Sequence, residues 1–165
     1  MLVEMFSPVF MEQGEIRPTI RFKKGLNVVL GKEDGANSIG KSSAMLAIDF
    51  VFGGDTYLKS DGVKHIGHHT IFFAFQFDGQ KHYFARATED ADKVFLCKEN
   101  YDLIGPHWTK AEFVDWLKSQ YHMDFDGLSF RIALSSFFRI YGKDNTDERR
   151  PLRGIPGQDM EKSIA

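Results

Sequence analysis

Residues 35–42 read G-A-N-S-I-G-K-S. They match the phosphate-binding loop pattern G-x-x-x-x-G-K-[ST], whose glycines let backbone N–H groups turn toward phosphate oxygens. In this pattern Lys41 reaches the β- and γ-phosphates, and the Ser42 hydroxyl ligates Mg²⁺. A helix that starts near Gly40 would add the positive end of its dipole. The expected binding residues are Gly35, Asn37, Ser38, Ile39, Gly40, Lys41, Ser42 and Ser43.

The segments on both sides of this loop agree with the pattern. Residues 26–30 (L-N-V-V-L) form a short apolar run, which is typical of a fully buried strand. Residues 43–52 have helical apolar spacing, and Gly53-Gly54 would end that helix. Residues 32–34 form a short insertion at the loop entrance, and Ser38 stands where a glycine is common. Neither departure removes the lysine or the hydroxyl.

Composition places the chain among ordinary globular proteins. It has 165 residues, 42% hydrophobic and 27% charged, which is enough for one domain with a core. Its net charge of −2 gives no global basic field for nucleic acid. The single cysteine, Cys97, excludes an internal disulfide and fits a reducing cytosol, so we expect a cytoplasmic protein. We expect no membrane span and no signal peptide.

Period-two alternation after the first helix predicts an antiparallel meander. Its strongest local signal is Asp78-Gly79, a hairpin turn between two alternating runs. The expected strands cover residues 2–11, 17–22, 26–30, 70–77, 82–87 and 93–97. Residues 55–67 are polar and punctuated by glycine, so we expect an irregular segment there.

Helices are expected after the meander. Thr109 is a good N-cap, and Glu112 three residues later completes a capping box. A second helix is expected at about residues 128–140. The chain therefore divides into a lobe, residues 1–143, and a polar tail, residues 144–165, that is mobile or leads into a further segment.

Two other groups have residue types that can bind metal. His65, His68 and His69 could bind Zn²⁺ or Cu²⁺, but no carboxylate or thiol with matching spacing lies nearby. A solvated loop is the favoured interpretation. Asp49 and Asp55 follow the loop and are possible acids near Mg²⁺; because Asp49 lies over two helical turns beyond the loop, a structural or surface role is favoured for it.

Several arginines are candidates for anion binding. Arg131 and Arg139 are spaced to share one helix face, where they could anchor a phosphate or form surface ion pairs; both interpretations stay open. Arg149, Arg150 and Arg153 form a small basic run that neighbouring acids dilute, so a solvated loop is favoured over nucleic-acid contact. No catalytic triad, HExxH or C-x-x-C pattern is present.

The order of these motifs resembles the opening of SMC-like ATPases. Those proteins share the pattern F-x-x-G-x-N-x-[IV]-x-G … N-G-x-G-K-S … A-I … G. The corresponding segments here are residues 19–31 (T-I-R-F-K-K-G-L-N-V-V-L-G), 37–43 (N-S-I-G-K-S-S) and 47–54 (A-I-D-F-V-F-G-G). The family comprises ABC-type ATPases of chromosome maintenance and DNA break repair, with RecN and RecF proteins as relatives. The resemblance is firm over residues 17–54.

This resemblance implies an α/β P-loop NTPase fold with a mixed sheet, an antiparallel meander and C-terminal helices. It also implies that ATP and Mg²⁺ bind at the loop, with Ser42 as the metal ligand. Its expected partners are a C-terminal lobe of the same parent protein, joined through a coiled coil, and a second head that sandwiches ATP. DNA is a further possible partner.

The chain departs from the family pattern downstream of the loop. It has no heptads, no Walker B run ending in Asp-Glu, no S-G-G signature and no clear Q-loop glutamine; Phe137-Phe138-Arg139 occupies the approximate place. We therefore expect no catalytic residue within the chain. It reads as an N-terminal piece of an ATPase that binds nucleotide and hydrolyses it poorly or not at all.

Two other function classes remain. A non-enzymatic, nucleotide-gated interaction module, in a defence or toxin-like system, would carry the same loop. A P-loop kinase or small-molecule NTPase is disfavoured, because such enzymes continue with parallel βαβ units rather than a meander.

Overall fold

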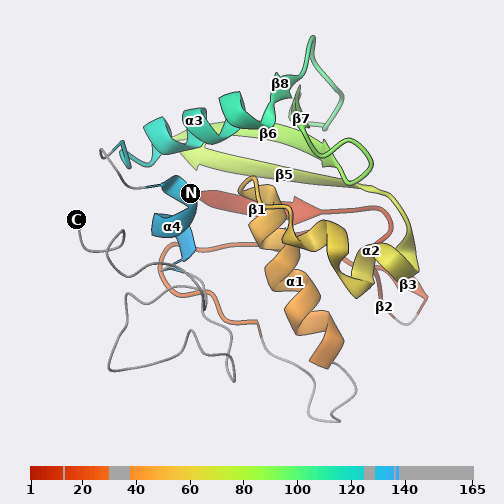
Figure 1. The fold of residues 1–165 in the computed structure, drawn as a ribbon. Coiled ribbons are helices and arrows are strands. Elements are labelled where there is room, and N and C mark those ends of the chain that lie inside the picture. The colour runs from red at the N-terminus through yellow and green to blue at the C-terminus, as the bar shows by residue number, and fades with distance from the viewer. Residues whose placement is uncertain (13, 30–37, 125–128, 136, 138–165) are drawn as a thin grey trace, which may run out of the picture. The chain divides into compact units, whose positions relative to one another are not determined.

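The computed structural model describes residues 1–12, 14–29, 38–124, 129–135 and 137. It divides into two units, Met1–Asp115 and Trp116–Ala165. The first unit is a mixed α/β arrangement built on a six-stranded antiparallel sheet (Figure 1). The antiparallel meander that the sequence predicts is therefore confirmed.

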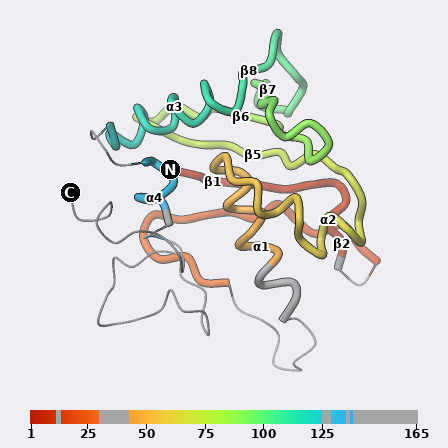
Figure 2. The backbone as a smooth tube through the Cα atoms, viewed as in Figure 1, coloured from red at the N-terminus to blue at the C-terminus, as the bar shows by residue number. Residues whose placement is uncertain are grey.

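The sheet has the strand order β4-β1-β5-β6-β7-β8, and each neighbouring pair is antiparallel. A separate two-stranded hairpin pairs β2 with β3. The path of the chain through these strands can be followed in Figure 2. The strands are β1 (Leu2–Phe6), β2 (Met11–Glu12), β3 (Glu15–Ile16), β4 (Ile20–Arg21), β5 (Thr70–Phe77), β6 (Gln80–Ala87), β7 (Lys93–Cys97) and β8 (Trp108–Thr109). The helices are α1 (Ser38–Val51), the 3₁₀ helix η1 (Thr56–Lys59), α2 (Asp61–Ile66), α3 (Lys110–Gln120) and α4 (Phe130–Ser135).

The β5–β6 hairpin is the longest pairing in the sheet. It runs in register from Thr70↔Ala87 to Phe77↔Gln80. Its two-residue turn has positive φ at both positions, 47° at Asp78 and 80° at Gly79. This is the geometry that the Asp-Gly pair predicts for a tight hairpin.

One face of the sheet packs against helices α1 and α3. Phe75 contacts Phe52 beyond the end of α1 at a ring-centroid distance of 5.2 Å, and it contacts Phe113 of α3 at 6.3 Å. Phe73 and Phe84 lie on the same face and also contact Phe113. All of these rings except that of Phe52 are fully buried. This aromatic cluster holds both helices on one side of the sheet.

The opposite face is covered by the loop after β7. Because side chains alternate along a strand, Phe72 and Tyr83 point away from α1 and α3. Tyr101 packs on them at centroid distances of 5.7 and 5.4 Å, and on Phe6 at 5.0 Å. Its hydroxyl donates a hydrogen bond of 3.0 Å to Glu4 Oε1. Tyr101 is therefore part of the packing on the face remote from α1.

Both helix ends that the sequence predicts have the expected capping groups. Thr109 N donates to Glu112 Oε2 at 2.7 Å, and Glu112 N donates to Thr109 Oγ1 at 3.2 Å, which confirms the capping box of α3. At the end of α1, Gly54 N donates to the Asp49 carbonyl and Gly53 N to the Phe50 carbonyl. These are the two bonds of a Schellman motif, with Gly53 (φ 90°) in the position that needs a left-handed residue.

The expectation of a buried strand at residues 26–30 is wrong for the described residues 26–29. They lie in no strand, and Leu26 and Val28 are 89% and 63% exposed. The Asn27 side chain instead closes a turn with the backbone of Lys23 and Gly25. No strand of the described sheet pairs with these residues, in keeping with their exposure. The expected mixed sheet is also wrong within the described part of the chain, where every pairing is antiparallel.

Other boundaries also differ from the sequence expectations. Residues 55–67 are mostly helical, with η1 and α2, because Ser60 caps α2 by accepting a hydrogen bond from Val63 N. The strand expected at 17–22 contracts to β4, and the run at 2–11 divides into β1 and β2. The second C-terminal helix is described only as α4, and the rest of its expected range, like the tail 144–165, lies outside the described residues.

Candidate functional site

The described part of the segment that matches the phosphate-binding pattern is the N-terminal end of α1. That helix begins at Ser38, so Ser38, Ile39, Gly40, Lys41 and Ser42 form its first turns and Ser43 follows directly. Its first turn contains no acidic residue. The first four backbone N–H groups of a helix have no partner within the helix, so this end favours an anion. Gly35 and Asn37 lie outside the described residues.

Arg86 of β6 holds the opposite end of α1. This side chain is fully buried, and its Nη1 donates to the Phe50 carbonyl at 2.6 Å and the Gly54 carbonyl at 2.8 Å. Its Nε donates to the Ala91 carbonyl at 2.7 Å, and its guanidinium carbon lies 4.0 Å from the centre of the Phe50 ring. A cation at the negative end of the helix dipole is favourable, and these acceptors replace the water that the buried charge loses.

Asp55 completes the charge balance at this end of α1. Its Oδ1 accepts from Arg86 Nη2 at 2.9 Å, and its Oδ2 accepts from Lys110 Nζ at 2.7 Å. Burial alone would raise the pKa of Asp55, but the hydrogen bonds from Lys110 and Arg86 outweigh burial and lower that pKa. The hydrogen bond to Asp55 is in turn the main reason that the pKa of Lys110 is raised. Lys110 also pairs with Asp92 at 3.1 Å.

The two acids after the loop, Asp49 and Asp55, do not lie where a ligand of a magnesium ion bound at Ser42 would lie. Ser42 and Val51 are nine positions apart, or roughly 14 Å along the helix, so Asp55, beyond Val51, lies at the end of α1 remote from the loop. Asp49 contributes its carbonyl to the Schellman motif at that same end. Neither acid is therefore placed beside Ser42, and Asp55 has a structural role in the pairing with Arg86.

The three histidines point to different protein groups. His65 Nδ1 lies 2.7 Å from the Asp61 carbonyl, and His68 Nδ1 lies 3.3 Å from Thr88 Oγ1. His69 is buried and bonds to other partners. Within the described residues, no three His, Cys, Asp or Glu side chains are grouped to hold a metal ion.

His69 belongs to a buried hydrogen-bonded chain. Its Nδ1 lies 2.8 Å from the Gly67 carbonyl, so Nδ1–H donates there and Nε2 accepts from the Tyr57 hydroxyl at 3.0 Å. Burial raises the pKa of Tyr57 to about 12, which keeps the phenol protonated as the donor. This chain joins η1 to the start of β5 and has a structural role.

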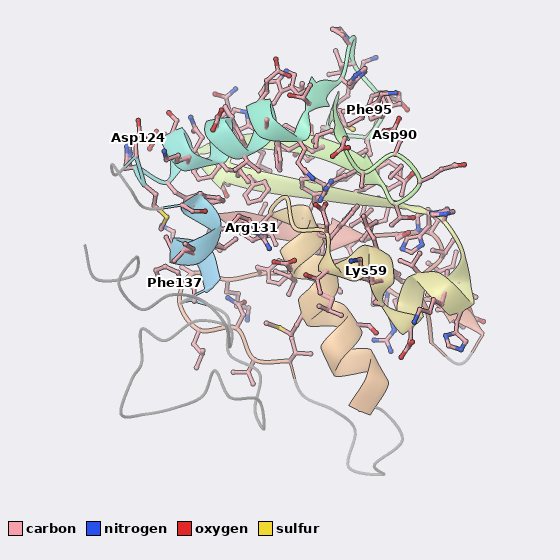
Figure 3. All side chains as sticks on the ribbon, viewed as in Figure 1. Lys59, Asp90, Phe95, Asp124, Arg131 and Phe137 are labelled. Atoms are coloured by element: carbon pink, nitrogen blue, oxygen red, sulfur yellow. The ribbon has the colours of Figure 1, made fainter. Side chains whose placement is uncertain are left out.

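The remaining candidates lie in the second unit, in β7, or outside the described residues. Figure 3 shows Arg131 on α4 and Phe137 just beyond it, and Phe137 is 72% exposed. Cys97 is buried, and desolvation raises its thiol pKa to about 11, in agreement with an inert residue. Phe138, Arg139, Arg149, Arg150 and Arg153 lie outside the described residues.

The residue that sequence reasoning missed is Arg86. The sequence did indicate that Arg86 is buried, because alternation along β6 places it on the same face as the buried Phe84. An arginine on the buried face of a strand requires several acceptors. The pattern could therefore have marked a buried cation, but not its partners, which lie between residues 50 and 91.

Among the described residues, no helix is both long enough and apolar enough to cross a bilayer. Comparison with protein-family models, with curated proteins and with solved structures finds no match to this chain.

Proposed function

We propose that this chain is the ATP-binding N-terminal part of an SMC-like ATPase head. The observation that carries the proposal is the position of α1, which begins inside the loop pattern. Gly40, Lys41 and Ser42 lie in the first turns of this helix, which supports the proposal because the phosphate-binding pattern also opens a helix. The helix start also carries no acid that would repel phosphate. Mg²⁺ would bind with the nucleotide through the Ser42 hydroxyl.

The exposed apolar residues before the loop support the presence of a partner that covers them. Leu26, Val28 and Val29 are 89%, 63% and 42% exposed, although their apolar pattern is that of a buried strand. The C-terminal lobe that the resemblance implies would supply a surface to cover such a segment. We therefore propose that the C-terminal lobe of the parent protein is the first partner and that a second head is the next.

The biological role follows from the resemblance in the sequence. We propose a cytoplasmic protein that acts in DNA repair, chromosome maintenance or DNA-directed defence. Hydrolysis would need the Walker B acid and the signature of the C-terminal lobe. In contrast, a nucleotide-gated interaction module would bind ATP without turnover even when the remaining lobe is supplied.

The test is ATP binding measured by calorimetry with Mg²⁺, comparing the wild type with Lys41→Ala. We expect the substitution to weaken binding by about 100-fold, because hydrogen bonds to charged groups contribute about 1.5–3 kcal/mol each. Lys24→Ala removes an exposed lysine outside the pattern and is the matched control, with unchanged affinity expected. Equal affinity of the wild type and Lys41→Ala would refute the loop assignment. Robust ATP turnover by these residues alone would contradict the incomplete head.

A further inference from the structure

Within the part of α1 whose burial is described, residues 43–51, burial increases toward the C-terminal end. Residues 43–46 are only partly buried, whereas the residues around the end of the helix are buried in the protein interior. The buried members are Ala47, Ile48, Phe50, Val51 and Phe52. These buried residues anchor α1 to the protein interior at its C-terminal end.

Arg86 is the polar part of that anchor. Through Nη1 it bonds the carbonyls of Phe50 and Gly54, and through Nη2 it bonds Asp55, so it contacts the end of the helix and the segment that follows. Nε ties the same side chain to the Ala91 carbonyl after β6. The planar guanidinium thus fixes the direction of α1 relative to the sheet, which a single bond would not.

We propose that Arg86, held by Asp55, is a positioning residue for the nucleotide site at the other end of α1. The proposal rests on the proposed function. Phe50 and Ser42 are eight positions apart, or roughly 12 Å along the helix, so a tilt of about 5° at the anchor displaces Ser42 by about 1 Å. Displacements of about 1 Å are enough to lose most of the benefit of a preorganised site.

The experiment compares two variants with two controls. Arg86→Lys keeps the charge but loses the fork of donors, and Asp55→Asn keeps an acceptor but loses the charge that holds the fork. Tyr101→Ala removes three aromatic contacts on the opposite face of the sheet and controls for lost stability. Asp92→Asn removes the other carboxylate that pairs with Lys110, without a bond to α1 or Arg86.

Two measurements are made on each protein. The first is the ATP dissociation constant, corrected for the folded fraction from a denaturation curve. We expect it to rise about tenfold or more in Arg86→Lys and a few-fold in Asp55→Asn, and to stay unchanged in both controls. The second is amide hydrogen exchange in residues 40–46 without nucleotide. It should be faster in Arg86→Lys than in Tyr101→Ala at matched stability, because only the first variant loosens the anchor.

The outcomes separate this proposal from the proposed function. Unchanged affinity in Arg86→Lys and Asp55→Asn, or an equal loss in Tyr101→Ala, would overturn the positioning role and leave ATP binding intact. Failure of the wild-type chain to bind ATP would overturn the proposed function, and the positioning role with it. Normal exchange in residues 40–46 of Arg86→Lys would also overturn the positioning role.

Discussion

Replacing Gly53 by alanine should destabilise the protein for two separable reasons. Gly53 has φ of 90°, where an L-residue costs roughly 1–2 kcal/mol. A Cβ at this position would lie 2.6 Å from Val114 Cγ2, well inside contact distance. Relief of such a clash in a packed interface costs typically 1–3 kcal/mol. We therefore expect Gly53→Ala to lower the free energy of unfolding by about 2–5 kcal/mol.

The chain offers a control for the backbone contribution. Gly79 has φ of 80° and nothing within 4 Å of an added Cβ, so Gly79→Ala should cost only about 1–2 kcal/mol. The double variant Gly53→Ala/Val114→Ala removes the clashing methyl group. It should be more stable than the sum of the two single effects by about 1–3 kcal/mol.

The assay is urea denaturation followed by tryptophan fluorescence and circular dichroism, since coincident curves from the two probes support a two-state analysis. A clash between the added methyl group and Val114 is refuted if Gly53→Ala costs no more than Gly79→Ala. It is also refuted by strict additivity in the double variant, because that result would show no coupling between the methyl group and Val114.

Two further predictions concern helix α3. His122 has φ of 52° and occupies the left-handed position of the Schellman motif that ends α3. Because glycine adopts this conformation without strain, His122→Gly should raise the free energy of unfolding by about 0.5–1 kcal/mol in the same denaturation assay. A loss of stability would contradict this prediction. At the other end, the hydrogen bond from Thr109 N is the main reason that the pKa of Glu112 is lowered below its ordinary value of 4.5. Because its folded-state pKa is lowered, ionised Glu112 contributes to the free energy of unfolding above pH 4.5, and this contribution is lost as the pH falls through the folded pKa. Glu112→Gln should therefore remove that step from the dependence of the unfolding free energy on pH. An unchanged dependence on pH would argue against the capping box.

Features that depend on neighbouring residues were predictable from the sequence. Asp78-Gly79 fixes a two-residue hairpin because few residue pairs accept positive φ at both positions. Thr109 and Glu112 form their box within one helical turn, so no distant contact is needed. The start of α1 inside the loop pattern belongs to this class, because apolar spacing and the terminal glycines define that helix locally.

Features that depend on distant partners were not predictable. Leu26 and Val28 have the sequence of a buried strand, but burial needs strands alongside, and the described sheet provides none at that place. Arg86 could be placed on the buried face by alternation alone. Its acceptors, however, come from two distant segments, residues 50–55 at the end of α1 and Ala91 after β6, and no local pattern connects them to Arg86.

The lengths of the strands in the main sheet have a consequence for how copies of this chain behave in solution. β5 and β6 have eight residues each and lie inside the sheet, whereas the two outermost strands, β4 and β8, have two residues each. A free strand edge is a template on which another chain can add by backbone hydrogen bonding, and very short outer strands limit that template. Within the described sheet, the phenylalanine-rich hairpin lies away from both outer edges, where another copy could add.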